Sequence, residues 1–461
     1  MSHRRKWARL TAAGGLLGLL AACTSAPASA PQSVAGSRPA ASTIAGSPAP
    51  PTRASASAQA PTSTSAQAPT TDAPHAPPTS APPTSSPTPA TPSAPPAPAA
   101  SVSATPALGS TGISPSAPIS IAATHGRIAS LTMTNTDGKV VQGSLSGDGS
   151  RWTLGEDLGY DKTYTVTGIA TGADGRSVPI DGNFSTVSPD DEVNAMIAPA
   201  DGEVVGIAES IIVHFPSKPE NTDAVEKALT VTTTPHVEGA WAWIHHDGGW
   251  GIDWRPKNYW PAGTKVHVDA KLYGVEFSPG EFGAGDVTSD FTIGRSQVVY
   301  ADANSYQIVI KQGCTAMKDP GSCRSTVATY DASYGKGDRS DSKDPNLVTR
   351  SGIHVVSELL SQHIMVGSPP YTYHSVEYWD ARISDNGEFI HENPNTVGDQ
   401  GNTNVSHGCI NLSPKNAESY FKSALLGDPV EVTGTSVQLS AADGDVFDWT
   451  FPWSEWLNLP A

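Results

Sequence analysis

The sequence predicts a mainly β protein, built from two small β-sandwiches followed by a third β-rich domain with one short helix. Beyond about residue 119, short runs of alternating apolar and polar residues are separated by Asp-Gly pairs. This pattern is typical of sandwich strands joined by tight turns. One segment near residue 416 has apolar residues at helical spacing instead. The residues before the first predicted sandwich have a low-complexity composition and predict no fold.

The N-terminus, residues 1–23, predicts export. A basic start is followed by an apolar run from Leu10 to Ala22, which is too short to cross a bilayer and indicates a cleaved signal peptide. Its end, Leu-Ala-Ala-Cys23, resembles a bacterial lipobox. That resemblance implies lipidation of Cys23 and an anchor on the outer face of the cell membrane. An ordinary signal peptide cut after Ala22, with Cys23 incidental, is the alternative.

Residues 24–114 consist almost entirely of Ala, Pro, Ser and Thr, and no aromatic residue occurs between Trp7 and Trp152. Such a segment cannot bury enough apolar surface to offset its ordering entropy. We therefore expect a disordered linker, long enough to carry a folded head away from a membrane.

The two sandwiches are predicted at residues 115–188 and 189–295, with a short helix between Asn221 and Leu229 in the second. Neither contains a cysteine, so neither has the disulfide of an antibody domain. The run WAWIHHDGGWGIDW, residues 241–254, is interpreted as a strand and hairpin that supply core and interface. A surface on which sugars stack is the alternative. Both sandwiches are interpreted as spacer or positioning modules.

The third domain is predicted at residues 296–433. Its helix has Ser413 and Pro414 as start signals and Gly427 beyond its end. Residues 434–461 contain the run WTFPWSEW, which is too apolar for a loose tail. We expect this C-terminal subdomain to pack against a folded domain.

Within the third domain, the run SHGCIN places Cys409 beside Gly408, with His391 eighteen residues earlier. A thiol needs a neighbouring imidazole to become a thiolate at neutral pH, so the pattern predicts a sulfur nucleophile and its base. Gly408 leaves room for backbone N–H groups around Cys409 to face an oxyanion. The alternatives are a buried structural cysteine and a structural histidine. The histidines lack ligand-pair spacing, so we predict no metal and no cofactor.

The segment from residue 387 to residue 414, GEFIHENPNTVGDQGNTNVSHGCINLSP, resembles the L,D-transpeptidase catalytic domain. The order of domains resembles the actinobacterial type, with two immunoglobulin-like modules and a tryptophan-rich C-terminal subdomain. The resemblance implies that Cys409 is acylated by the tetrapeptide stem of peptidoglycan and releases D-Ala. The acyl group then passes to the diaminopimelate amine of another stem, which makes a 3→3 cross-link. Carbapenem-type β-lactams are expected as covalent inhibitors.

The resemblance also implies roles for residues around the nucleophile. His407 and Asn411 would line the cleft, and Tyr373, Asn386 and Gly387 match stem-peptide-binding positions. Simple packing of a lid is the alternative for Tyr373, and an indirect hydrogen-bonding role is the alternative for His407. The chain departs from the family at Glu392, where a small hydroxyl residue is usual, and in a lid that looks short.

Two further cysteines, Cys314 and Cys323, flank the loop CTAMKDPGSC. In an exported protein this spacing predicts a disulfide that closes the loop. A bond from one of them to Cys409 would destroy the nucleophile and is the alternative.

Other functions remain open at this stage. Water in place of the acceptor amine would make the protein an L,D-carboxypeptidase or endopeptidase, and a scaffold anchored in the wall would need no chemistry. The net charge of −17 disfavours nucleic acid as a partner.

Overall fold

The computed structural model describes residues 97–459, except 247, 368 and 444–446. The predicted signal peptide, Cys23 and most of the predicted linker lie outside the described residues. No helix among the described residues is long and apolar enough to cross a membrane.

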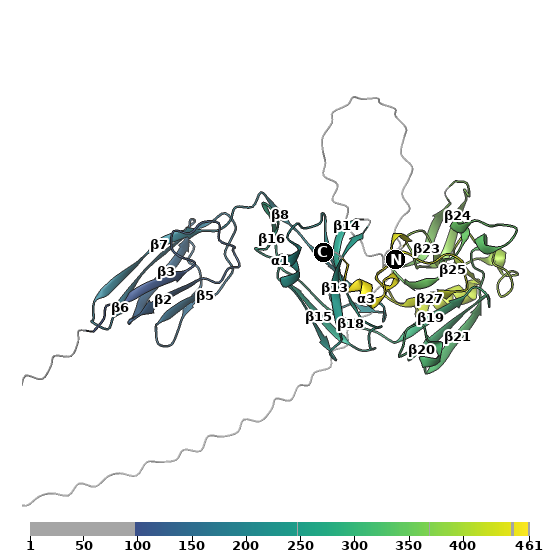
Figure 1. Ribbon diagram of the computed structural model, residues 1–461, viewed down its shortest axis with the longest axis horizontal. Helices are drawn as coiled ribbons and strands as arrows, with labels where there is room; N and C mark the ends of the chain where they lie inside the picture. Colours follow the sequence, from purple (N-terminus) through teal and green to yellow (C-terminus); the bar gives the residue numbers. More distant parts are fainter. Residues whose placement is uncertain (1–96, 247, 368, 444–446, 460–461) are drawn as a thin grey trace, which may run out of the picture. The chain divides into compact units, whose positions relative to one another are not determined.

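The first sandwich packs a four-stranded sheet, in the order β1-β2-β5-β4, on a three-stranded sheet, β3-β6-β7 (Figure 1). Side chains from both sheets, including Ile121 and Val166, meet in one apolar core. The strands are β1 Ser101–Thr105, β2 Ser120–Thr124, β3 Gly126–Asn135, β4 Gly143–Leu145, β5 Arg151–Leu154, β6 Thr163–Gly172 and β7 Ser177–Ser185.

The start of this sandwich corrects the predicted linker, which was placed as far as residue 114. Strand β1 pairs antiparallel with β2, Ser101 opposite Thr124, and Ile113 forms a bridge to Thr186. The sequence SVSAT has only one large apolar residue. Its order comes from backbone pairing at the edge of a sheet, which composition does not reveal.

The second sandwich consists of two four-stranded sheets, β10-β18-β15-β12 and β13-β14-β11-β9, with a small sheet β16-β17-β8 beside them. Its elements are β8 Asp191–Val193, β9 Met196–Ala198, β10 Val204–Val205, β11 Ile211–Phe215, α1 Thr222–Lys227, β12 Leu229–Thr234, β13 Gly239–His246, β14 Gly249–Pro256, β15 Lys265–Ala270, β16 Glu276–Ser278, β17 Glu281–Gly283 and β18 Val287–Ile293. The aromatic run 241–254 is a hairpin, with Trp243 and Trp254 buried between the sheets. The prediction of a strand and hairpin core is confirmed.

The third domain has a five-stranded sheet, β21-β20-β19-β27-β22, and a four-stranded sheet, β23-β24-β25-β26. The strands are β19 Gln297–Asp302, β20 Gln307–Gln312, β21 Ser325–Asp331, β22 Gly352–Val355, β23 Glu358–Val366, β24 His374–Arg382, β25 Phe389–Glu392, β26 Ile410–Leu412 and β27 Pro429–Thr433. The short 3₁₀ helices are η1 Pro320–Ser322, η2 Lys336–Asp338, η3 Pro345–Leu347 and η4 Pro394–Thr396. A single core joins both sheets to helix α2, Pro414–Ser423.

Helix α2 begins where the sequence predicts it. The Ser413 hydroxyl accepts from the Asn416 N–H, and Pro414 occupies the first turn, where no N–H is needed. The helix buries Ala417 and Tyr420 against the sheet that carries the predicted base. In this way α2 supports β24 and β25 from behind.

The C-terminal segment continues with η5 Ala441–Asp443, η6 Asp448–Thr450 and α3 Trp453–Trp456. It packs on the second sandwich: the indole N–H of Trp456 donates to Ala240 O at 3.0 Å, and that of Trp449 donates to Ala208 O at 2.8 Å. The buried guanidinium of Arg255 lies over the rings of both tryptophans and of Trp453, 4.8 to 5.3 Å from their centroids. This packing agrees with the expectation that the tryptophan-rich end is not loose.

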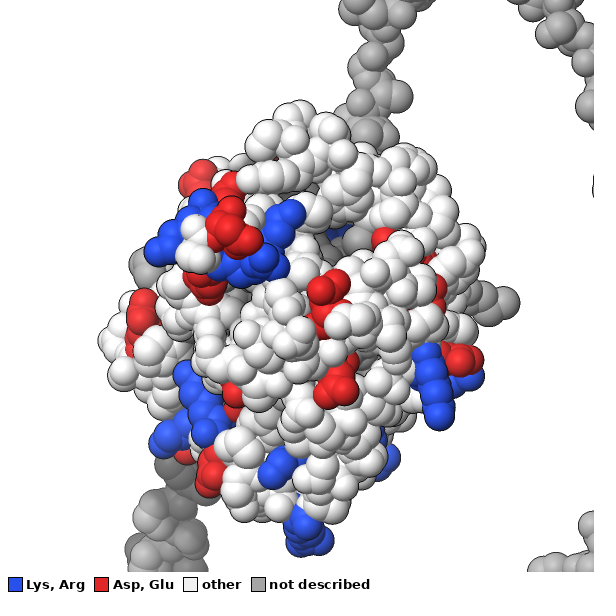
Figure 2. Space-filling view, turned by 90° about the vertical axis from the view of Figure 1, so that its right-hand side faces the viewer, with Lys and Arg blue, Asp and Glu red and all other residues white. Residues whose placement is uncertain are grey.

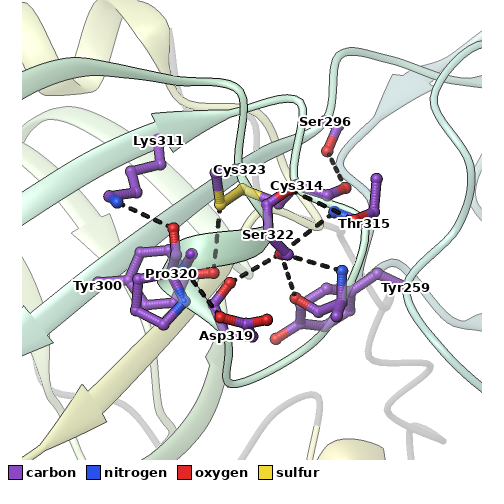
Figure 3. The surroundings of a disulfide bond; sticks show 12 residues. Tyr259, Ser296, Tyr300, Lys311, Cys314, Thr315, Asp319, Pro320, Ser322 and Cys323 are labelled. Carbon is purple, nitrogen blue, oxygen red and sulfur yellow. Dashed lines mark hydrogen bonds between the residues drawn. A yellow bond between two sulfur atoms is a disulfide. The ribbon is translucent and has the colours of Figure 1, made fainter.

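A disulfide joins Cys314 to Cys323 and closes a loop beside β20 (Figure 3). The hydroxyl of Ser322 contacts Asp319 O at 2.7 Å and Ala316 O at 3.2 Å inside the loop. Cys409 is not in a disulfide. On the face drawn in Figure 2, Lys and Arg gather only in small groups beside Asp and Glu, between wide uncharged areas.

Candidate active site

A cavity of about 870 Å³ opens in the third domain between the β23–β24 hairpin, β25 and the loop before β26. Cys409 lies in its wall, 9% exposed. The predicted site residues His391, His407, Tyr373, Asn386, Gly387 and Asn411 also line it. Seven residues from four separate stretches of the chain are thus brought to one cavity. Cys314 and Cys323 do not line it.

The turn that carries Cys409 is fixed by two buried hydroxyls. Ser406 Oγ donates to Cys409 O at 2.6 Å and accepts from the Gly408 N–H at 3.1 Å. Thr349 Oγ donates to Gly408 O at 2.6 Å and accepts from the Gly335 N–H at 2.8 Å. Gly408 has φ +132°, in the region that favours glycine. The N–H of Gly408 therefore already has a partner inside the turn, which leaves the N–H of Cys409 as the candidate oxyanion donor of the two.

His391 reaches the cavity from β25, whose parallel neighbour β26 follows Cys409 directly. Its imidazole is 4% exposed, and Nδ1 lies 3.5 Å from Oε2 of Glu377 on β24. The thiol of Cys409 donates to Gly387 O at 3.5 Å on the other side.

The surroundings of His391 favour its charged form. Burial alone would lower the pKa of His391, but the contacts with Cys409 and Glu377 and the charge of Asp380 raise it to about 10. A raised imidazole pKa beside a thiol favours an imidazolium–thiolate pair. The arrangement therefore brings a thiol and a proton-carrying imidazole together at one wall of the cavity.

Two carboxyl groups on β24 lie behind the imidazole, and they differ in charge. Glu377 keeps a lowered pKa: burial opposes ionisation, but its contacts with His391 and Ser375 outweigh burial. Asp380 is fully buried, and burial together with the charges of Glu377 and Glu392 raises its pKa to about 7. Glu377 is thus the ionised partner of the ring. The charge of Glu392, the sequence departure beside the base, also interacts with His391, but Glu392 is not among the groups with the largest effect on the pKa of His391.

The loop between β23 and β24 covers His407. The Tyr373 ring stacks on the imidazole at 5.5 Å with an 18° tilt, and the Tyr371 ring lies 5.6 Å away. Lys336 Nζ approaches His407 Nε2 at 3.3 Å. Burial first and then the Lys336 charge lower the pKa of His407, so its ring accepts rather than donates at that nitrogen. The hydroxyl of Tyr371 donates to Asp344 Oδ2 at 2.7 Å. This hydrogen bond anchors the loop between β23 and β24, which is called the lid.

Asn386 and Gly387 form the turn before β25. The Asn386 amide lies between Ser384 and Arg350, and with its oxygen toward the guanidinium both contacts are satisfied. Gly387 has φ +89° and presents its carbonyl to the thiol. Asn411, next to His391 across β25 and β26, donates to Thr396 Oγ at 3.3 Å. Its backbone N–H also donates to Ser333 O at 2.8 Å.

Sequence reasoning missed Glu377, Asp380 and Thr349. Two acidic residues within the strand sequence HSVEYWDAR were a usable signal, because charged side chains in a sheet usually need a partner. Thr349 had no such signal, since its role depends on contacts with Gly335 and Gly408, which are distant in the sequence. No group of three or more candidate metal ligands occurs among the residues that the structure describes.

Comparisons with known proteins identify the family. Residues 298–432 match the L,D-transpeptidase catalytic domain, and residues 110–276 match a bacterial Ig domain. The chain is 47% identical to L,D-transpeptidase 5 of Mycobacterium tuberculosis over 77% of its own length and 76% of that protein. The chain belongs to the L,D-transpeptidase family.

Other L,D-transpeptidases are also similar to it. L,D-transpeptidase 2 of Mycobacterium tuberculosis is 35% identical over 76% of this chain and 82% of that protein. A solved structure of the L,D-transpeptidase LdtMt1 in complex with imipenem is 28% identical, covers 53% of this chain and 99% of that one, and gives a TM-score of 0.41. This L,D-transpeptidase is therefore an enzyme with immunoglobulin-like and catalytic domains, as predicted.

Proposed function

We propose that this L,D-transpeptidase forms 3→3 cross-links between diaminopimelate residues of peptidoglycan stems through a thioester on Cys409. The observation that carries the proposal is the contact of a buried imidazole, His391, with the thiol at the wall of an 870 Å³ cavity. Family membership supports the reaction class. The cavity volume lies in the range of sites that enclose small ligands.

The reaction has two halves. The Cys409 thiolate attacks the carbonyl of the third residue of a donor tetrapeptide, and we assign the N–H of Cys409 as a donor to the oxyanion. The bond to D-Ala breaks, and the His391 imidazolium gives its proton to the leaving amine. The neutral imidazole then takes a proton from the incoming diaminopimelate amine, which attacks the thioester and regenerates the thiolate.

The test is to incubate the full-length protein with disaccharide-tetrapeptide and analyse the products by mass spectrometry. We expect 3→3 linked dimers and released D-Ala, and neither product with Cys409→Ala. Tripeptide without dimers would show that water is the acceptor and replace the proposal by an L,D-carboxypeptidase. If the folded protein gives neither dimers nor D-Ala exchange, the proposal is wrong.

We also propose that carbapenem-type β-lactams acylate Cys409, since an activated thiol opens a strained β-lactam carbonyl by the same attack. LdtMt1 has been solved with a carbapenem, imipenem, which makes this drug a suitable probe. The measurement is intact-protein mass after exposure to imipenem. An adduct of equal amount on Cys409→Ala would contradict the proposal.

For the cellular location, we propose export and a lipid anchor at Cys23, with residues 24–96 as a tether and the two sandwiches as spacers. The basic and apolar N-terminus ending in LAAC supports this proposal. Cells fed labelled palmitate should label the wild-type protein and leave Cys23→Ala unlabelled. Equal labelling of both proteins would contradict the anchor.

A further inference from the structure

The imidazole of His391 needs a group that holds its second nitrogen. A catalytic histidine works as a base only when its ring orientation and tautomer are set by a partner on the far side from the nucleophile. Nδ1 of His391 is buried and has no closely bonded partner among the residues that the structure describes. Whichever group faces Nδ1 therefore decides how the ring meets Cys409.

That group is the carboxylate of Glu377. Oε2 lies 3.5 Å from Nδ1, and the side chains of His391 and Glu377 are only 4% and 14% exposed. Since the glutamate comes from β24 and the histidine from β25, strand pairing between Ala381 and Ile390 fixes their relative position. A separation slightly beyond a hydrogen bond is usual for a catalytic pair without substrate.

We propose that Glu377 is the positioning residue of this L,D-transpeptidase: it holds the His391 ring with Nδ1 protonated and directs the ring toward Cys409. The inference rests on the proposed function for its chemical purpose, but the geometry concerns only the thiol, the imidazole and the carboxylate. Glu377 acts through His391 and touches neither the acyl group nor the leaving amine.

Two other acidic residues are close enough to be considered. Both carboxyl oxygens of Asp380 are buried without a hydrogen bond among the described residues, and Oδ2 lies 3.4 Å from His363 Nδ1. Burial raises the pKa of Asp380 to about 7, whereas the pKa of Glu377 is lowered, so Glu377 is the better anion for His391. Glu392 follows His391 directly, and alternation along a strand points its side chain to the opposite face. Glu392 is therefore absent from the cavity wall, which Glu377 lines.

The charge balance at His391 has a measurable consequence. The titratable or charged groups that face this cluster are Cys409, Glu377, Asp380, His363, Arg382 and Tyr373. Glu392 lies on the other face of β25, but its charge still acts on Asp380 and His391. An anion beside the ring raises the pKa of His391 and so stabilises an imidazolium next to the thiol, which favours attack by the sulfur. Removing the anion should lower the pKa of His391 and make Cys409 less reactive toward alkylation below neutral pH.

The experiment measures the rate of iodoacetamide alkylation of full-length protein from pH 5 to pH 9, followed on the Cys409 peptide by mass spectrometry. We expect Glu377→Gln to reduce the rate at pH 6 by about tenfold or more, because an opposite charge at this range changes a pKa by roughly one to three. Glu377→Asp should recover part of the loss. The matched control Glu392→Gln removes a charge that acts on His391 without lining the cavity, and it should shift the profile much less than Glu377→Gln.

An unchanged profile for Glu377→Gln would overturn the inference, and so would an equal shift for Glu392→Gln. If Glu377→Gln fails to fold, nitrogen-15 NMR of histidine-labelled wild-type protein decides the matter. We expect Nδ1 of His391 to stay protonated across this pH range, and loss of that proton in the folded protein would overturn the inference. Alkylation needs no stem peptide, so a shifted profile without any cross-linking would count against the proposed function alone.

Discussion

Thr349→Val tests whether a buried hydroxyl holds the catalytic turn. Valine has nearly the same shape as threonine, so the change removes two hydrogen bonds without opening a cavity. Thr349 is fully buried, and its hydroxyl joins Gly408 O at 2.6 Å to the Gly335 N–H at 2.8 Å. Both backbone groups would lose their partner.

The expected effect follows from those two groups. A buried donor or acceptor left without its partner costs about 1 to 3 kcal/mol, so the pair should cost roughly 2 to 6 kcal/mol. For a domain of this size each kcal/mol lowers the melting temperature by about 2 to 4 °C, which predicts a loss of at least about 4 °C. The carbonyl of Gly408 precedes the N–H of Cys409, so a turn that relaxes also slows acylation.

The assay combines thermal unfolding with the rate at which imipenem adds to Cys409, measured by intact-protein mass. Thr349→Ser, which keeps the hydroxyl, is the matched control and should lose much less on both counts. A melting temperature and acylation rate unchanged in Thr349→Val would refute the reasoning. Equal losses in Thr349→Val and Thr349→Ser would refute it as well, because they would assign the effect to the methyl group.

Three further predictions concern the lid, the disulfide and the C-terminal segment. Tyr371→Phe removes the hydrogen bond that lowers the pKa of Asp344, so backbone hydrogen exchange in the lid should become faster at neutral pH. Wild type and variant should converge as pH falls through the folded-state pKa of Asp344. Equal exchange at neutral pH would show that this hydrogen bond does not hold the lid. Replacing Cys314 and Cys323 by serine opens a loop with a sequence separation of 9, and this should lower the free energy of unfolding by about 3 kcal/mol in a denaturant titration. Acylation by imipenem should continue, and loss of the adduct would contradict the view that the disulfide is separate from the active site. Trp456→Ala should lower the free energy of unfolding by about 3 to 5 kcal/mol in the same titration, because Trp456 is 1% exposed. A loss below about 1 kcal/mol would show that the C-terminal segment does not pack stably on the second sandwich.

Local patterns in the sequence were sufficient for much of the β structure, for the helix and for several residues that line the cavity with Cys409. Helix α2 depends on Ser413, Pro414 and its own apolar face, all of which lie within one short segment. The SHGC run and His391 could be read for the same reason, since β25 and β26 are close in sequence and pair directly. The residues that determine these features are close together in the sequence.

What the sequence could not reveal depends on contacts between distant segments. Glu377 meets His391 only because β24 pairs with β25, and nothing in the sequence indicates which of several carboxylates will face the ring. Strand β1 was missed because its order comes from pairing with β2, not from its own composition.

The most direct test of the central claim is the intact mass of the protein during reaction with a donor tetrapeptide whose diaminopimelate side-chain amine is acetylated, so that no acceptor amine is present. We predict a covalent adduct equal to the acyl tripeptide, mapped to Cys409, together with one released D-Ala per adduct. Cys409→Ala should show neither. An adduct on another residue, or D-Ala release that persists in Cys409→Ala, would contradict the account.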